Sequence, residues 1–140
     1  MSIKEIQDEI VDEFSMFDDW MQRYEYIIDL GKGLPLIEEQ YKTEENIITG
    51  CQSKVWVHAE QKEGKVVFTA DSDAILTKGI IAILIRSFSN QKASDILDAN
   101  TDFIDEIGLK EHLSPTRANG LVSMIKKLKM YALAFNAKNE

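Results

Sequence analysis

Apolar residues recur every three or four positions in two stretches near the amino terminus. That spacing places them on one face of an α-helix. The first stretch covers residues 3–12 and the second covers residues 17–30. The segment that follows, GKGLP at 31–35, holds the glycines and the proline that commonly end a helix. The pattern therefore predicts two amphipathic helices at the start of the chain.

A period of two replaces the helical spacing at residues 55–60, VWVHAE. Alternate residues of a β-strand point to opposite faces of a sheet, so this segment is expected to bury one side. The following QKEGK supplies a turn, and the apolar run at 66–70 returns as the second arm of a hairpin. With a short strand at 47–48, the chain is expected to form about three antiparallel strands.

Residues 74–88 are apolar on almost every side, which is typical of a central, buried helix. Ser72 or Asp73 is expected to cap its amino terminus by accepting hydrogen bonds from the first free N–H groups. For Asp73 the alternative is a charge that contacts a partner. Gly79 lowers helix propensity, so another backbone is expected to pass close to it.

The remaining chain favours helices. Short ones are expected at 93–97 and 103–107, and a long one at 115–135, introduced by Ser114 as the cap and a proline at the first helical position. Together these elements predict an α+β fold in which helices pack on one face of a small antiparallel sheet. The 140 residues are expected to form a single domain.

Composition limits where the protein is expected to work. Its one cysteine cannot form an internal disulfide, which suits the reducing cytoplasm. The first ten residues carry acids where an export signal would be apolar. The longest apolar run, GIIAILI, is far shorter than the ~20 residues of a membrane span. We therefore expect a cytoplasmic protein that does not insert into membranes.

The formal net charge is −8 and the pI is about 4.8. The negative electrostatic field of such a protein repels nucleic acids, so DNA and RNA are not expected as partners. Basic protein surfaces are the charged partners that the net charge favours. The alternative is that the acidity only keeps the protein soluble.

Few residues form a recognisable catalytic or metal-binding pattern. His58 and His112 are the only histidines, and neither lies in a spacing typical of metal ligands. The chain has no phosphate-binding or dinucleotide-binding glycine motif. We expect surface or packing roles for both histidines, and neither a metal nor a cofactor of the protein's own.

Cys51 stands out because of its setting. A lone cysteine is often an apolar core residue. Here it follows Gly50, which allows a sharp bend, and precedes the polar Gln52 and Ser53, just before a predicted strand. This context leaves two interpretations open, a buried filler or a reactive thiol on a loop.

Four sequence blocks resemble the SufE family. They are DLGKGLP at 29–35, GCQSKVW at 50–56, DSDA at 71–74 and LSPTRANGL at 113–121. They occur in the family's order and spacing, and the resemblance extends from about residue 20 to the last helix. It implies a fold similar to that of SufE and of the scaffold protein IscU.

The resemblance also implies a function. SufE proteins accept sulfur for iron–sulfur cluster assembly from a SufS-type cysteine desulfurase, which they stimulate, and pass it to a scaffold such as SufB. The pyridoxal phosphate belongs to the desulfurase, and SufE is an accessory sulfur carrier rather than a stand-alone enzyme. A scaffold needs several ligands to hold iron. A single cysteine fits the carrier.

The resemblance assigns Cys51 as the persulfide acceptor, reactive as its thiolate. Arg117 is the candidate to stabilise that thiolate; the alternative is a structural ion pair. We expect Cys51 to lie against apolar side chains, Ile48 and Val55 among them, and to swing out when the desulfurase docks. The residues expected to flank the thiol and contact the partner are Gly50, Gln52, Ser53, Asp73 and Asn119.

Two other functions are consistent with a lone cysteine. One is a single-cysteine redox sensor or peroxidase-like protein, which also needs an accessible thiolate. The chain lacks the threonine that usually precedes a peroxidase cysteine. The other is an interaction module whose cysteine is inert.

Overall fold

Two antiparallel strands, β1 (Val55–Lys62) and β2 (Lys65–Ser72), form the sheet of the computed structural model, which describes residues 1–51 and 53–138. Glu63 and Gly64 between them both have positive φ, 52° and 79°. A two-residue turn of this kind matches the twist of the strands it joins. The predicted hairpin is therefore confirmed, with longer arms than expected.

The sheet has two strands in the described residues, not about three. Beyond the hairpin, the described residues make only isolated bridges to it: Ile47 pairs with Trp56 of β1, and Leu36 and Gln91 pair with Ala70 and Val66 of β2. Ile47 leaves the short 3-10 helix η2 (Glu44–Asn46), and the chain turns again at Gly50. Too few residues lie between these turns to extend the pairing into a strand.

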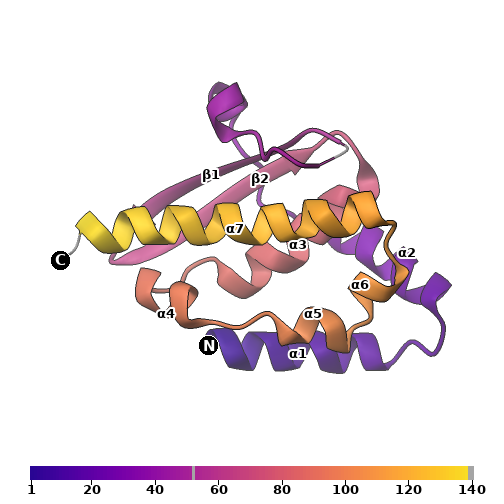
Figure 1. Cartoon of the computed structure of the whole chain (residues 1–140). Coiled ribbons are helices and arrows are strands. Elements are labelled where there is room, and N and C mark those ends of the chain that lie inside the picture. Colours follow the sequence, from indigo (N-terminus) through magenta and orange to yellow (C-terminus); the bar gives the residue numbers. More distant parts are fainter. Residues whose placement is uncertain (52, 139–140) are drawn as a thin grey trace.

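Helices cover one face of the hairpin, as the α+β prediction required (Figure 1). The central one is α3 (Ile75–Phe88), with 11 of its 14 residues buried. The long α7 (Pro115–Lys138) lies beside α3 on the same side. Its first turn is capped as predicted, since the Ser114 hydroxyl accepts the Arg117 N–H at 3.3 Å.

The two amino-terminal helices, α1 (Ile3–Ser15) and α2 (Trp20–Gly31), pack on α3 from the other side. At the crossing of α2 and α3, a Cβ on Gly79 would lie 2.1 Å from the carbonyl oxygen of Ile27. The expected close backbone neighbour of Gly79 is thus the carboxyl-terminal half of α2.

A charged cluster ties these three helices together. Arg86 of α3 donates to Glu13 of α1 at 2.8 Å and to Glu9 at 2.9 Å, and the Tyr26 hydroxyl of α2 also donates to Glu13. The hydrogen bonds from Arg86 lower the pKa of Glu13. Burial and the neighbouring carboxylate raise the pKa of Tyr26 to about 12.

Short helices complete the chain. They are η1 (Glu39–Tyr41), α4 (Ala93–Asp98), α5 (Asp102–Glu106) and α6 (Leu109–His112). The sequence pattern predicted α4 and α5 to within a residue or two at each end but missed α6, because four residues carry too little periodicity to detect. No helix in the described parts of the chain is long and apolar enough to cross a bilayer.

Candidate functional site

Cys51 lies in the loop that leads from η2 into β1. The Ile48 N–H donates to the Val55 carbonyl at 2.8 Å and closes the base of this loop. Gly50 has φ +92°, a conformation that other L-residues rarely adopt. The loop is therefore held at its base and bent by a glycine directly before the thiol.

A second glycine makes room for the thiol on α7. A Cβ added to Gly120 would lie 3.2 Å from Cys51 Sγ, and one added to Gly50 would lie 2.7 Å from Ser123 Oγ. Glycines at both contact points let the loop lie against the helix. Gly120 was not singled out from the sequence, although a glycine inside a helix pattern often marks a close approach.

The thiol is partly buried and packs against the edge of the hydrophobic core. Its Sγ lies 3.6 Å from the carbonyl oxygen of Gly120, to which the thiol proton is donated. Burial raises the pKa of Cys51 above its ordinary value. In this position the sulfur is held as the neutral thiol, which is the less reactive form.

A small hollow of about 10 Å³ adjoins the sulfur. It has room for about one water-sized group. Its apolar walls come from Ile80 and Met124. The predicted apolar neighbours Ile48 and Val55 are buried in the core cluster against which Cys51 packs. The other lining residues are Ser53, Thr77, Arg117 and Gly120. Thr77 and Gly120 join the site from helices that the sequence could not place beside the loop.

Arg117 lines the same hollow from the first turn of α7, and its residue is exposed. It forms no ion pair with a carboxylate of the described residues. The structural ion pair that we considered as the alternative is thus not seen there. The guanidinium is close enough to line the same hollow as the sulfur and is not neutralised by these carboxylates.

Asp73 does not cap α3, and that prediction is wrong. The helix begins after Ala74 without a side-chain cap, and the Asp73 carboxylate accepts the Lys54 N–H at 3.0 Å. The Asp73 N–H in turn donates to the Lys54 carbonyl at 3.2 Å. Asp73 therefore holds the end of the cysteine loop, while the nearby Ser72 hydroxyl accepts the Ala74 N–H.

The other residues predicted to contact the partner do not all lie at the hollow. Ser53 lines the hollow, whereas Asn119 is exposed on α7 and is not one of the lining residues. Its carbonyl accepts a hydrogen bond from the Ser123 hydroxyl. Gln52 lies outside the described residues.

Both histidines make packing contacts. The His58 ring stacks on Tyr41 with ring centroids 3.7 Å apart, and the His112 ring stacks on Trp20 at 4.2 Å. Within residues 1–51 and 53–138, no three or more His, Cys, Asp or Glu side chains gather closely enough to hold a metal ion.

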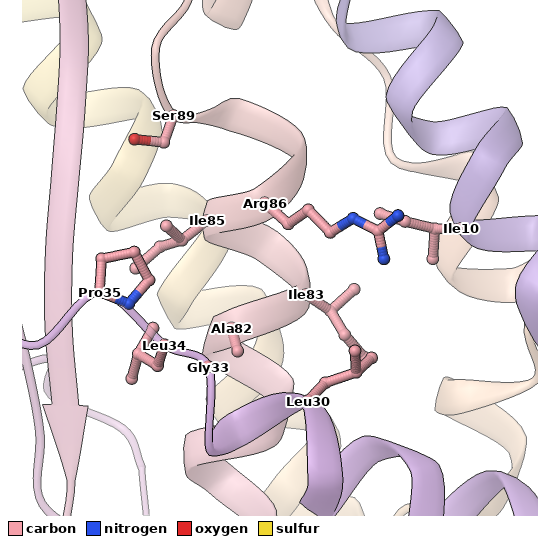
Figure 2. Close-up of a pocket in the computed structure, with 10 residues that line it drawn as sticks. All are labelled: Ile10, Leu30, Gly33, Leu34, Pro35, Ala82, Ile83, Ile85, Arg86 and Ser89. Atoms are coloured by element: carbon pink, nitrogen blue, oxygen red, sulfur yellow. The ribbon is translucent and has the colours of Figure 1, made fainter.

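A larger cavity, of about 350 Å³, lies between α1, the end of α2 and α3 (Figure 2). Its walls are mostly apolar. Its two polar side chains already have partners, since Arg86 is paired with Glu13 and Glu9, and the Ser89 hydroxyl accepts the Phe68 N–H. The cavity thus offers no free polar side chain to orient a polar substrate, and none of its lining residues lines the Cys51 hollow.

Comparisons with known proteins agree with this architecture. A sequence model of the SufE family, described as an Fe-S metabolism associated domain, matches residues 8–132. An uncharacterised SufE-like protein of Rhizobium meliloti (strain 1021) is 44% identical over 131 residues, covering 89% of this chain and 93% of the relative. The SufE-like protein 1, chloroplastic/mitochondrial, of Arabidopsis thaliana is 41% identical over 133 residues, covering 94% of this chain and 36% of the plant protein.

The fold is also found among solved structures. The solution structure of a hypothetical protein from Thermus thermophilus superposes with a TM-score of 0.76, covering 92% of this chain and 94% of that one. At 19% sequence identity, this likeness concerns the fold alone.

Proposed function

The chain belongs to the SufE family of Fe–S metabolism associated domains, and from that premise we propose that Cys51 carries sulfur for cluster assembly. Cys51 would receive the sulfur from a SufS-type cysteine desulfurase, stimulate that enzyme, and pass the sulfur to a scaffold such as SufB. The observation that supports this most directly is a single thiol on a glycine-bent loop, beside a hollow with room for about one further atom.

The transfer is a thiol–persulfide exchange. The Cys51 thiolate attacks the outer sulfur of the desulfurase persulfide, a new S–S bond forms, and the old one breaks to leave the desulfurase thiolate. Electrons and atoms balance without an oxidant or reductant. The carrier needs no cofactor for this step, and the pyridoxal phosphate that cleaves the C–S bond of free cysteine belongs to the desulfurase.

Reaction requires the thiol to leave its position on α7. While it donates to the Gly120 carbonyl in partly buried surroundings, its pKa is raised and little thiolate forms. Movement outward at Gly50 removes the burial and so returns the pKa toward its ordinary value. Arg117 then supplies a nearby positive charge that favours the thiolate.

The hollow suits the loaded state. An outer sulfur on Cys51 would enter a space lined by Ile80 and Met124, where water and soluble reductants have poor access. The same contacts that suppress reactivity of the free thiol would thus protect the persulfide between donor and acceptor.

Desulfurase turnover with a Cys51→Ser variant tests the proposal. Wild-type protein should increase alanine production by a SufS-type desulfurase in the presence of reductant. The variant should bind the desulfurase with similar affinity and give no increase. Full stimulation by the serine variant would show that the effect comes from binding alone, as expected of an interaction module with an inert cysteine.

The peroxidase-like alternative requires a different pKa of the thiol. A peroxidatic cysteine needs a lowered pKa, whereas burial raises the pKa of Cys51. We therefore expect hydrogen peroxide to oxidise Cys51 no faster than it oxidises free cysteine. Oxidation that is faster by about tenfold or more would favour the redox function.

A further inference from the structure

Thr77 of α3 places a hydroxyl group beside the Cys51 hollow. The residue is only 7% exposed, and it lines the hollow together with the sulfur. Its hydroxyl forms no hydrogen bond with any residue of the described ranges 1–51 and 53–138. No side-chain oxygen sealed inside these ranges lacks a partner, so the Thr77 oxygen is reachable, and the hollow is the space that it lines. A shielded hydroxyl without a partner at such a place indicates a binding position.

The Thr77 hydroxyl is not used by its own helix. A serine or threonine inside a helix commonly turns its hydroxyl back to the carbonyl four residues earlier. In α7 the Ser123 hydroxyl does this, donating to the Asn119 carbonyl at 3.2 Å. In α3 the residue four positions before Thr77 is Asp73, which lies ahead of the helix and is bound to Lys54. The Thr77 hydroxyl therefore keeps its proton available for a group in the hollow.

The surroundings of the hollow favour negative charge. It lies between the beginnings of two helices, since Thr77 and Ile80 are the third and sixth residues of α3. Arg117 and Gly120 are likewise the third and sixth residues of α7. The amino terminus of a helix carries partial positive charge, which favours a nearby anion. Among the described residues that line the hollow, Arg117 is cationic and none is a carboxylate.

A persulfide on Cys51 needs a different partner from the free thiol. Its outer sulfur lies about 2 Å beyond Sγ and loses its proton more readily than a thiol does, because the S–H bond of a persulfide is weaker. The Gly120 carbonyl accepts the proton of the free thiol, but it offers only lone pairs and cannot bind an anion. The anionic outer sulfur therefore requires a hydrogen-bond donor, which stabilises the charged form.

Thr77 is better placed for this than the other donors at the hollow. Ser53 lies on the cysteine loop and is only half-buried, so it moves with the thiol when the loop swings out. Arg117 is exposed, and water screens its charge. Thr77 is held on a helix with 11 of 14 residues buried. A donor fixed there binds the outer sulfur while the loop lies against α7 and releases it when the loop moves.

We infer that the Thr77 hydroxyl donates a hydrogen bond to the outer sulfur of loaded Cys51 and holds the persulfide in the hollow as its anion. The inference rests on the proposed function, which supplies the persulfide. The outer sulfur gives its proton to solvent and the hydroxyl keeps its own, so no oxidant or reductant is involved. A thiolate reductant attacks an anionic persulfide slowly, because both carry negative charge. The hydrogen bond thus lengthens the lifetime of the carried sulfur.

The pH profile of persulfide alkylation tests this hydrogen bond. Inorganic polysulfide loads Cys51 without a desulfurase, and mass spectrometry follows the reaction of the loaded protein with iodoacetamide. Thr77→Val removes the hydroxyl and keeps the shape, so the midpoint of the profile should rise by about half a pH unit or more. Thr77→Ser should keep the wild-type midpoint. Thr69→Val is the matched control, since it makes the same change on β2, away from the hollow.

Loss of the outer sulfur to glutathione at neutral pH is the second readout, and Thr77→Val should lose it about threefold faster or more. Midpoints equal to that of Thr69→Val would overturn the inference. A midpoint that moves in Ser53→Ala and not in Thr77→Val would overturn it too, by assigning the donor to the loop. An equal shift in the profile of the unloaded thiol would mean that the hydroxyl acts on Sγ instead. If the polysulfide-loaded protein shows the predicted shift but a SufS-type desulfurase never transfers sulfur to it, the hydrogen bond stands and the proposed function fails.

Discussion

At the scale of single residues, the Cys51 thiol lies between a left-handed glycine on its own loop and a helical glycine on α7. Gly50 sets the bend, and Gly120 leaves the space that the sulfur occupies. The carbonyl of Gly120 also receives the thiol proton. The reactivity of the thiol in the unbound protein is thus set by backbone atoms and by the absence of side chains at these two glycines.

Gly120→Ala should expose the thiol without unfolding the helix. The new methyl would lie 3.2 Å from Sγ, and the loop that carries the sulfur can yield more easily than the helix. Alanine favours a helix by up to about 1 kcal/mol over glycine, so stability should not fall. We expect alkylation of Cys51 by iodoacetamide to quicken by roughly threefold or more.

Gly33→Ala is the control for this experiment, because it makes the same substitution without contact to Cys51. It should leave the alkylation rate of Cys51 unchanged. When unfolded in urea, the wild type and both variants should be alkylated at the same rate. A Gly120→Ala protein that is stable and alkylated no faster than wild type would show that the glycine does not control access to the thiol.

Part of this site could be predicted from the sequence. Cys51, Ser53 and Arg117 were expected together, and they line one hollow. Thr77 and Gly120 were missed because their role depends on how α3 and α7 dock against the loop. No local sequence pattern indicates how these two helices pack against the loop.

At the scale of elements, the contact between α2 and α3 depends on backbone packing. Gly79→Ala should destabilise the protein by about 3 kcal/mol, because its methyl would meet the Ile27 carbonyl at 2.1 Å and neither helix can yield cheaply. Urea unfolding at equilibrium measures the loss. In Gly33→Ala the new methyl makes only an ordinary contact at 3.7 Å, so the change should stay within about 1 kcal/mol. Equal stability of the two variants would contradict the close crossing.

The predicted helices and strands were confirmed where the apolar pattern extended over many residues. The helices and the hairpin were predicted from repeated apolar positions, and their ends shifted by a few residues. Asp73 was misassigned because its partner, the Lys54 N–H, is 19 residues away, while a cap is a local signal. The prediction of a third strand at 47–48 was wrong for a similar reason. Ile47 pairs with Trp56 in a single bridge, and the turn at Gly50 ends the pairing there.

At the scale of the whole molecule, the cluster of Glu13, Tyr26 and Arg86 joins three helices. The pKa of Glu13 is lowered, so its contribution to stability is complete above its ordinary pKa of 4.5 and is lost as the pH falls through the lowered value. Glu13→Gln should therefore cost roughly 1–3 kcal/mol at neutral pH. The gap to wild type should narrow at acid pH, where wild-type Glu13 is also protonated.

Urea unfolding at several pH values measures this difference. Glu25→Gln is the matched control, because Glu25 is exposed on α2 and forms no ion pair with the described residues. It should change stability little at any pH. A Glu13→Gln gap that stays constant from neutral to acid pH would mean that the charge of Glu13 does not stabilise the fold.

The most direct measurement of the carrier function is the mass of the protein after brief mixing with a SufS-type desulfurase and free cysteine. We predict a gain of one sulfur atom, located on the peptide that contains Cys51 and removed by a thiol reductant. A protein that leaves the reaction without added sulfur on Cys51, while the desulfurase itself carries a persulfide, would contradict the account.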